Sequence, residues 1–149
     1  MEQRDRRIYN ISLKVSVVAT ALWSGILAVL LSDIIDQYAL EGTREGLMGS
    51  MISGGALVAL LATIFFQGRL KKTQMIIWGG FLTSAVLVAQ GVPMPFMLFL
   101  LACFAMGFGH GAVDASQSAF LADLNRGDTA RHMGALHGIF GIGGVMTPI

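Results

Sequence analysis

The feature that most constrains this chain is a run of 41 residues, Thr73 to Val113, that contains no Asp, Glu, Lys or Arg. A helix that crosses a bilayer needs about 20 apolar residues, because the hydrocarbon core is about 30 Å thick and a helix rises 1.5 Å per residue. The run is therefore long enough for two crossings, and Gly91, Pro93 and Pro95 mark the break between them. Only 13% of the residues are charged, too few for a soluble domain, where the fraction is about 25%.

Three further apolar segments flank this run. Eighteen uncharged residues separate Lys14 from Asp33, 23 separate Glu45 from Arg69, and a last segment starts near Met133. The first is long for a signal peptide and no A-x-A cleavage pattern follows it, which favours an uncleaved spanning helix. We therefore predict an all-α, multi-pass transmembrane helix bundle, with helices at about 12–32, 46–67, 74–90, 96–121 and 132–149.

The basic residues predict how these helices are oriented. Nine of the ten fall before or in the first turn of the first helix, between the second and third, or between the fourth and fifth, and only Arg44 lies in the opposite loops. The loop after the first helix is acidic, with Asp33, Asp36, Glu41 and Glu45. Under the positive-inside rule, these charges predict a cytoplasmic amino terminus. We expect the protein to lie in the cell (inner or plasma) membrane, where its helices contact the lipid bilayer.

Small residues recur at spacings of three and four in three of the predicted helices, which places each set along one helix face. Such faces indicate close helix packing, and they also leave room for a path between helices; the pattern fits both. The sets are Gly46, Gly49, Ser50, Ser53 and Gly54; Gly107 and Gly111; and Gly134, Gly138 and Gly141.

The helix predicted at 96–121 also carries polar residues. His110 and Asp114 are one turn apart, and Gln117 and Ser118 follow. An ionisable residue inside a membrane helix costs about 2.5–3.5 kcal/mol on insertion scales and normally faces the bundle interior or a water-filled cavity. We expect Asp114 to couple protons or contact substrate, with His110, Gln117 and Ser118 as further residues of the pathway. The alternatives for Asp114 are a structural residue bonded to a neighbouring helix or a position near the cytoplasmic interface. The alternative for His110 is a neutral imidazole that donates to a carbonyl or to Asp114. In the last helix, His137 beside the glycine face is either a pathway residue or a packing residue.

Residues 107–149 resemble the region from the fourth to the fifth helix of major facilitator superfamily transporters, in the branch of the fucose permease and related sugar permeases. Asp114 matches that branch's acidic position, and Ser118 stands where an Asn is usual. The later run is matched by Leu136, His137, Gly138, Gly141, Gly143 and Pro148. Asp123 and Arg131 resemble the acidic–Arg pair around the family's loop between the fourth and fifth helices.

The family's signature loop between the second and third helices would fall at 67–73. Gly68 and the basic residues Arg69, Lys71 and Lys72 are present, but the signature's Asp is missing. In the family that Asp helps to latch the cytoplasmic helix ends, so the resemblance does not extend to such a latch. Positive-inside anchoring is sufficient to explain the cluster.

The resemblance implies secondary transport of a small polar solute such as a sugar, coupled to H⁺, by twelve helices in two halves. The predicted helices make an incomplete amino-terminal half, so we expect further carboxy-terminal helices or a partner to complete the bundle and this chain alone not to transport. The alternatives are a small membrane scaffold or subunit and, third, an intramembrane enzyme using His110 and Asp114. We expect no enzyme activity, cofactor, metal site or nucleic-acid partner, and the chain has no phosphate-binding Gly-x-x-x-x-Gly-Lys loop.

Overall fold

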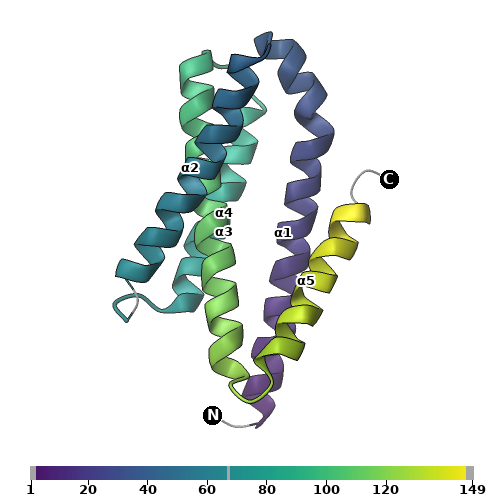
Figure 1. Cartoon of the computed structure of the whole chain (residues 1–149), viewed down its shortest axis with the longest axis vertical. Helices are drawn as coiled ribbons and strands as arrows, with labels where there is room; N and C mark the ends of the chain where they lie inside the picture. The colour runs from purple at the N-terminus through teal and green to yellow at the C-terminus, as the bar shows by residue number, and fades with distance from the viewer. Residues whose placement is uncertain (1–2, 67, 147–149) are drawn as a thin grey trace. The chain divides into compact units, whose positions relative to one another are not determined.

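The computed structural model describes residues 3–66 and 68–146, with the side chains of Gln3, Leu27, Ala28, Val145 and Met146 left out. The described chain is all-α, which confirms the predicted fold class at that level. Its helices are α1 (Gln3–Tyr38), α2 (Thr43–Phe65), α3 (Lys72–Gln90), α4 (Phe96–Leu124) and α5 (Thr129–Met146) (Figure 1).

Among the described residues, α2, α3 and α4 are long and apolar enough to cross a membrane. A fourth span is added if the two parts of α1, which meet at a 41° bend between Ile26 and Val29, are counted as one. The protein is therefore membrane-embedded. The predicted fifth span is not among these helices: α5 is described over 18 residues that include Arg131. Residues 147–149, with Pro148, lie outside the described part.

The predicted break in the long uncharged run is confirmed, since α3 ends at Gln90 and α4 begins at Phe96. Proline lacks a backbone N–H and cannot continue a helix, which explains the position of the break. The Pro95 carbonyl accepts hydrogen bonds from the amides of Leu98 and Phe99 at the start of α4. The first helix is longer than predicted at both ends, because residues outside the hydrocarbon region can remain helical and hydropathy does not mark that limit.

The chain divides into two compact units, which are described separately: Met1–Ile34 with Ser118–Ile149, and Ile35–Gln117. In the first unit, Leu13, Val17 and Ala21 recur every four residues along α1 and are buried. Gly143 of α5 lies against Ala21, so that a Cβ on Gly143 would be 2.6 Å from the Ala21 Cβ. Tyr9 and Phe120 meet edge to face with ring centroids 5.5 Å apart.

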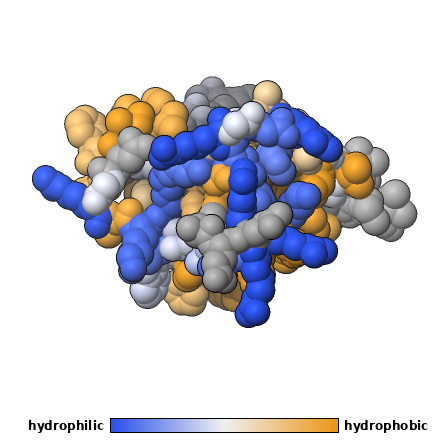
Figure 2. All heavy atoms as spheres, turned by 90° about the horizontal axis from the view of Figure 1, so that it is seen from below, coloured by the Kyte–Doolittle hydropathy of each residue, from blue (hydrophilic) through white to orange (hydrophobic). Residues whose placement is uncertain are grey.

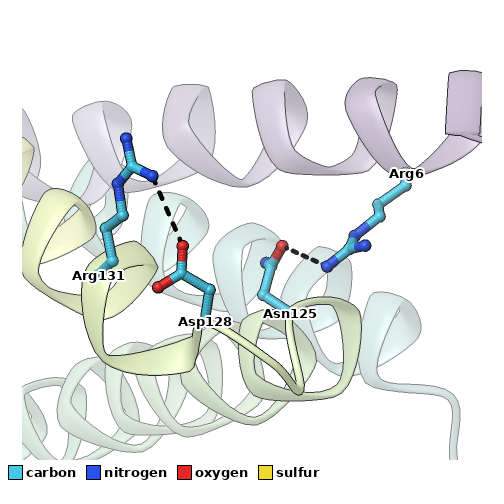
Figure 3. A network of polar contacts seen from close by, with 4 residues as sticks. All are labelled: Arg6, Asn125, Asp128 and Arg131. Atoms are coloured by element: carbon cyan, nitrogen blue, oxygen red, sulfur yellow. Dashed lines mark hydrogen bonds and ion pairs between the residues drawn. The ribbon is translucent and has the colours of Figure 1, made fainter.

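Asn125, buried at the end of α4, joins polar side chains within the first unit (Figure 3). Its Oδ1 accepts a hydrogen bond from Arg6 at 3.2 Å, and its Nδ2 donates to Asn10 Oδ1 at 3.0 Å. The same Nδ2 donates to the Leu121 carbonyl. Asn125 therefore ties the start of α1 to the end of α4.

In the second unit, α4 packs against both α2 and α3. Gly107 meets the backbone of Ile52, and Gly111, one turn later on α4, meets that of Ala56, one turn later on α2. The contacts therefore advance in the same chain direction on both helices. Gly79 and Thr83 of α3 meet Gly109, and Gly79 also meets Val113, which is the opposite order. The contacts show that α2 and α4 run parallel and α3 antiparallel to them, as successive membrane crossings must.

Only some of the glycines predicted to face a neighbouring helix do so. A Cβ on Gly46 or Gly49 would meet nothing within 4 Å in the described part of the chain, whereas a Cβ on the unpredicted Gly55 would clash with the backbone of Phe104 and, at 2.8 Å, of Phe108. Gly134, Gly138 and Gly141 likewise meet nothing within 4 Å. Gly107 and Gly111 were predicted correctly. Without a hydrophobic driving force between helices in lipid, such close backbone contact supports association through van der Waals packing.

Candidate functional site

The candidate site is the stretch of α4 from His110 to Asp114. His110 stands between Gly109, which meets α3, and Gly111, which meets α2. Because successive residues are about 100° apart around a helix, His110 points to a third side. Asp114 follows one turn later, four residues on, a spacing at which two helix side chains can meet.

Asp114 is exposed and His110 half-buried, and they are the first polar side chains after the apolar residues that begin α4 at Phe96, apart from Cys103. Asp114 is ten residues from the end of α4, or about 15 Å along the axis at 1.5 Å per residue. A hydrocarbon core about 30 Å thick, if centred on the 29 residues of α4, includes this carboxylate. An exposed acid at such a depth requires water, a polar solute, protonation or another polar group as its neighbour.

Toward its first turn, α4 is buried by aromatic packing. Tyr38 stacks on Phe99 with ring centroids 4.4 Å apart. Cys103, one turn after Phe99, is fully buried, and its Sγ accepts a hydrogen bond from Gln90 of α3 at 3.5 Å. Exposure of the third side therefore increases from Phe99 toward Asp114.

The other predicted pathway residues are distributed between the two units. Gln117 belongs to the same unit as Asp114 and is buried, with 2% of its surface exposed. Ser118, half-buried, and His137, exposed, belong to the other unit. The structure thus brings together His110 and Asp114, places Gln117 in the same unit, and leaves Ser118 and His137 outside it.

Two buried hydroxyls near this helix were missed from the sequence. Thr83 of α3 and Ser116 of α4 are both at least nine-tenths buried, and neither hydroxyl oxygen has a hydrogen-bond partner among the described residues. Ser and Thr are common in packed membrane helices, and nothing in their spacing distinguishes these two from Ser84 or Thr63.

The loop between α2 and α3 contains the predicted motif-like residues. Gly68 has φ +91°, a left-handed conformation that L side chains rarely adopt, so glycine is needed at this turn. Arg69 and Lys71 are exposed, and Lys72 is half-buried at the start of α3. Gln67 lies outside the described residues.

The predicted pair of Asp123 and Arg131 is placed in the first unit. Arg131 makes its ion pair with Asp128, three residues earlier, at 3.7 Å (Figure 3). The side chains of both are well exposed, at 84% and 52%. Asp123 is exposed on the last turns of α4.

The charged residues of the described chain lie mainly at helix ends and in loops. Figure 2 shows one face of the molecule, with many hydrophilic residues near its middle and hydrophobic residues mainly toward its margins. This distribution is typical of a protein whose helix flanks contact hydrocarbon.

Comparison with known proteins gives no function for this chain, so the arrangement of His110 and Asp114 is the basis for one. A scan against protein-family models gave no match to the chain. A search of curated proteins also gave no match.

Proposed function

We propose that this chain is part of a secondary transporter that moves a small polar solute, such as a sugar, across the cell membrane together with a proton. The observation that carries the proposal is the exposed carboxylate of Asp114, one turn from the half-buried His110 on α4. This assignment agrees with the resemblance of residues 107–149 to major facilitator superfamily permeases.

The proposed chemistry follows from the two charge states of one carboxylate. A protonated Asp114 avoids the cost of a charge in hydrocarbon, about 2.5–3.5 kcal/mol on insertion scales. The protonated carboxyl also both donates and accepts hydrogen bonds, so it suits solute hydroxyls. Proton binding and solute binding at Asp114 therefore favour each other. His110, one turn away on the same helix, is placed to tune this coupling.

The glycine contacts support the proposal by fixing α4. Backbone contact through Gly107 and Gly111 on α2, and through Gly109 on α3, leaves α4 little freedom to rotate. A fixed helix holds His110 and Asp114 in one orientation toward the solute. In the proposed transporter, this bundle rocks against further helices during alternating access, with the amino terminus cytoplasmic.

The remaining candidates have subordinate roles in the proposal. Gln117, Ser118 and His137 remain predicted pathway residues, Gln117 in the unit of Asp114 and the other two in the other unit. The basic loop residues and Asp123 with Arg131 lie at the cytoplasmic ends of the helices.

Binding by the purified chain tests the assignment. The chain, held in lipid nanodiscs, is titrated calorimetrically with a panel of monosaccharides, disaccharides and polyols. We expect one class to bind and Asp114→Asn to weaken its affinity about tenfold or more, the typical cost of losing a charged hydrogen bond. Asp123→Asn, a matched change on the same helix, leaves the affinity unchanged. Equal binding by wild type and Asp114→Asn would contradict the assignment.

A further inference from the structure

An apolar groove lies beside the basic loop in the second unit. It has a volume of about 370 Å³ and is walled by α2, α3 and α4. Its lining runs from Phe66 and Leu70 at the helix ends to Leu82 and Phe108 deeper in the unit. From Gln74 to Leu82 the groove follows α3 for eight residues, or about 12 Å at 1.5 Å per residue.

The groove walls offer a ligand little to hydrogen-bond. The hydroxyl of Thr63 already donates to the Ala59 carbonyl of its own helix at 2.8 Å. The Gln74 Oε1 accepts from the Lys71 amide at 3.3 Å. The other lining side chains are apolar apart from the indole N–H of Trp78. Water gains little in such a site, and an alkyl chain fits its chemistry.

The mouth of the groove is strongly basic. Arg69 and Lys71, both exposed, flank the lining residue Leu70, and Lys72 follows. The sequence from Gly46 to Val113 contains no Asp or Glu, so no acidic residue on these helices within that range balances the cations. Because α2 ends at Phe65 and α3 begins at Lys72, this loop lies at the depth of lipid headgroups.

We propose that this groove binds one anionic phospholipid, with an acyl chain between α2 and α3 and the phosphate against Arg69 and Lys71. The groove supplies the hydrophobic contact, and the basic loop selects for negative charge. The inference is independent of solute transport, because it uses neither His110 nor Asp114.

Trp78 gives a direct readout, since it lines the groove and is 68% exposed. The chain has two tryptophans, so a Trp23→Phe background isolates the fluorescence of Trp78. The full chain is reconstituted in phosphatidylcholine vesicles that contain a minor fraction of phosphatidylglycerol with brominated acyl chains, or the same fraction of brominated phosphatidylcholine. Bromine quenches tryptophan only on contact.

We expect brominated phosphatidylglycerol to quench Trp78 more strongly than brominated phosphatidylcholine. Arg69→Gln/Lys71→Gln abolishes that preference, since a basic residue near the headgroups contributes roughly fivefold in affinity. Arg4→Gln/Arg7→Gln, which also removes two exposed cations, retains the preference. Molar salt weakens it through screening.

Three results would overturn the proposal. Equal quenching by the two lipids would make the groove a site for neutral bulk lipid. A preference that survives Arg69→Gln/Lys71→Gln would place the anionic lipid elsewhere. No quenching by either lipid, with Trp78 shielded in cross-linked dimers, would make a second copy of the chain the occupant.

Discussion

Gly107 of α4 lies so close to Ile52 of α2 that a Cβ on the glycine would come within 2.7 Å of the Ile52 carbonyl carbon. The obstacle is backbone, which cannot move aside as a flexible side chain would. The helix pair therefore depends on the absence of a side chain at this position, as it does at Gly55 and Gly111.

Gly107→Ala is expected to destabilise the α2–α4 pair by about 1–3 kcal/mol, the usual cost of overpacking. The free energy of unfolding in mixed micelles, titrated with a denaturing detergent, measures the change. Gly46→Ala is the matched control, because a Cβ there meets nothing within 4 Å. Equal stability of the two variants would contradict the close contact of α2 with α4.

Asn125→Ala is expected to destabilise the first unit by about 1–3 kcal/mol, because buried polar partners are left unsatisfied. The substitution removes the hydrogen bonds with Arg6 and Asn10 together. Asn10→Ala, measured by the same unfolding titration, removes one of the two and should cost less. The reverse order would show that Asn125 does not join these residues.

Arg131→Gln is expected to change stability by less than about 0.5 kcal/mol, since exposed ion pairs contribute little. Its partner Asp128 and Arg131 itself are both well exposed. Thermal unfolding at low and high salt measures the effect. A loss above about 1 kcal/mol would indicate a partner beyond this ion pair.

The Cys103 thiol is expected to resist N-ethylmaleimide in the folded chain, because no part of the side chain is exposed. Labelling followed by mass spectrometry should show modification only after unfolding. Ala102→Cys, in a Cys103→Ala background, moves the thiol to a half-buried position on the same helix and should react faster. Rapid labelling of native Cys103 would contradict the packing of α3 against α4.

Much of the fold could be predicted from the sequence. Charge-free length and the Gly91–Pro95 segment located α2, α3 and α4 to within a few residues, because hydrocarbon thickness and proline chemistry fix both. The start of α1 could not be predicted in this way. Hydropathy marks where a helix enters the membrane, and it carries no signal for the helical turns outside.

The contacts of the candidate site were less predictable. Spacing showed that His110 and Asp114 share a helix side, but which glycines touch a neighbour depends on where two helices cross. The predicted glycine face therefore omitted Gly55 and included Gly46. Asn125 was missed because a polar residue that follows an apolar segment is typical of a loop. Its burial is visible only in the fold.

The most direct test of the account is the number of protons exchanged when a solute binds. Calorimetry of the nanodisc-held chain in two buffers of different ionisation enthalpy yields that number. The account predicts that solute binding exchanges protons with the wild-type chain and that Asp114→Asn exchanges none. Proton exchange of the same size in Asp114→Asn would contradict the assignment of Asp114 as the coupling residue.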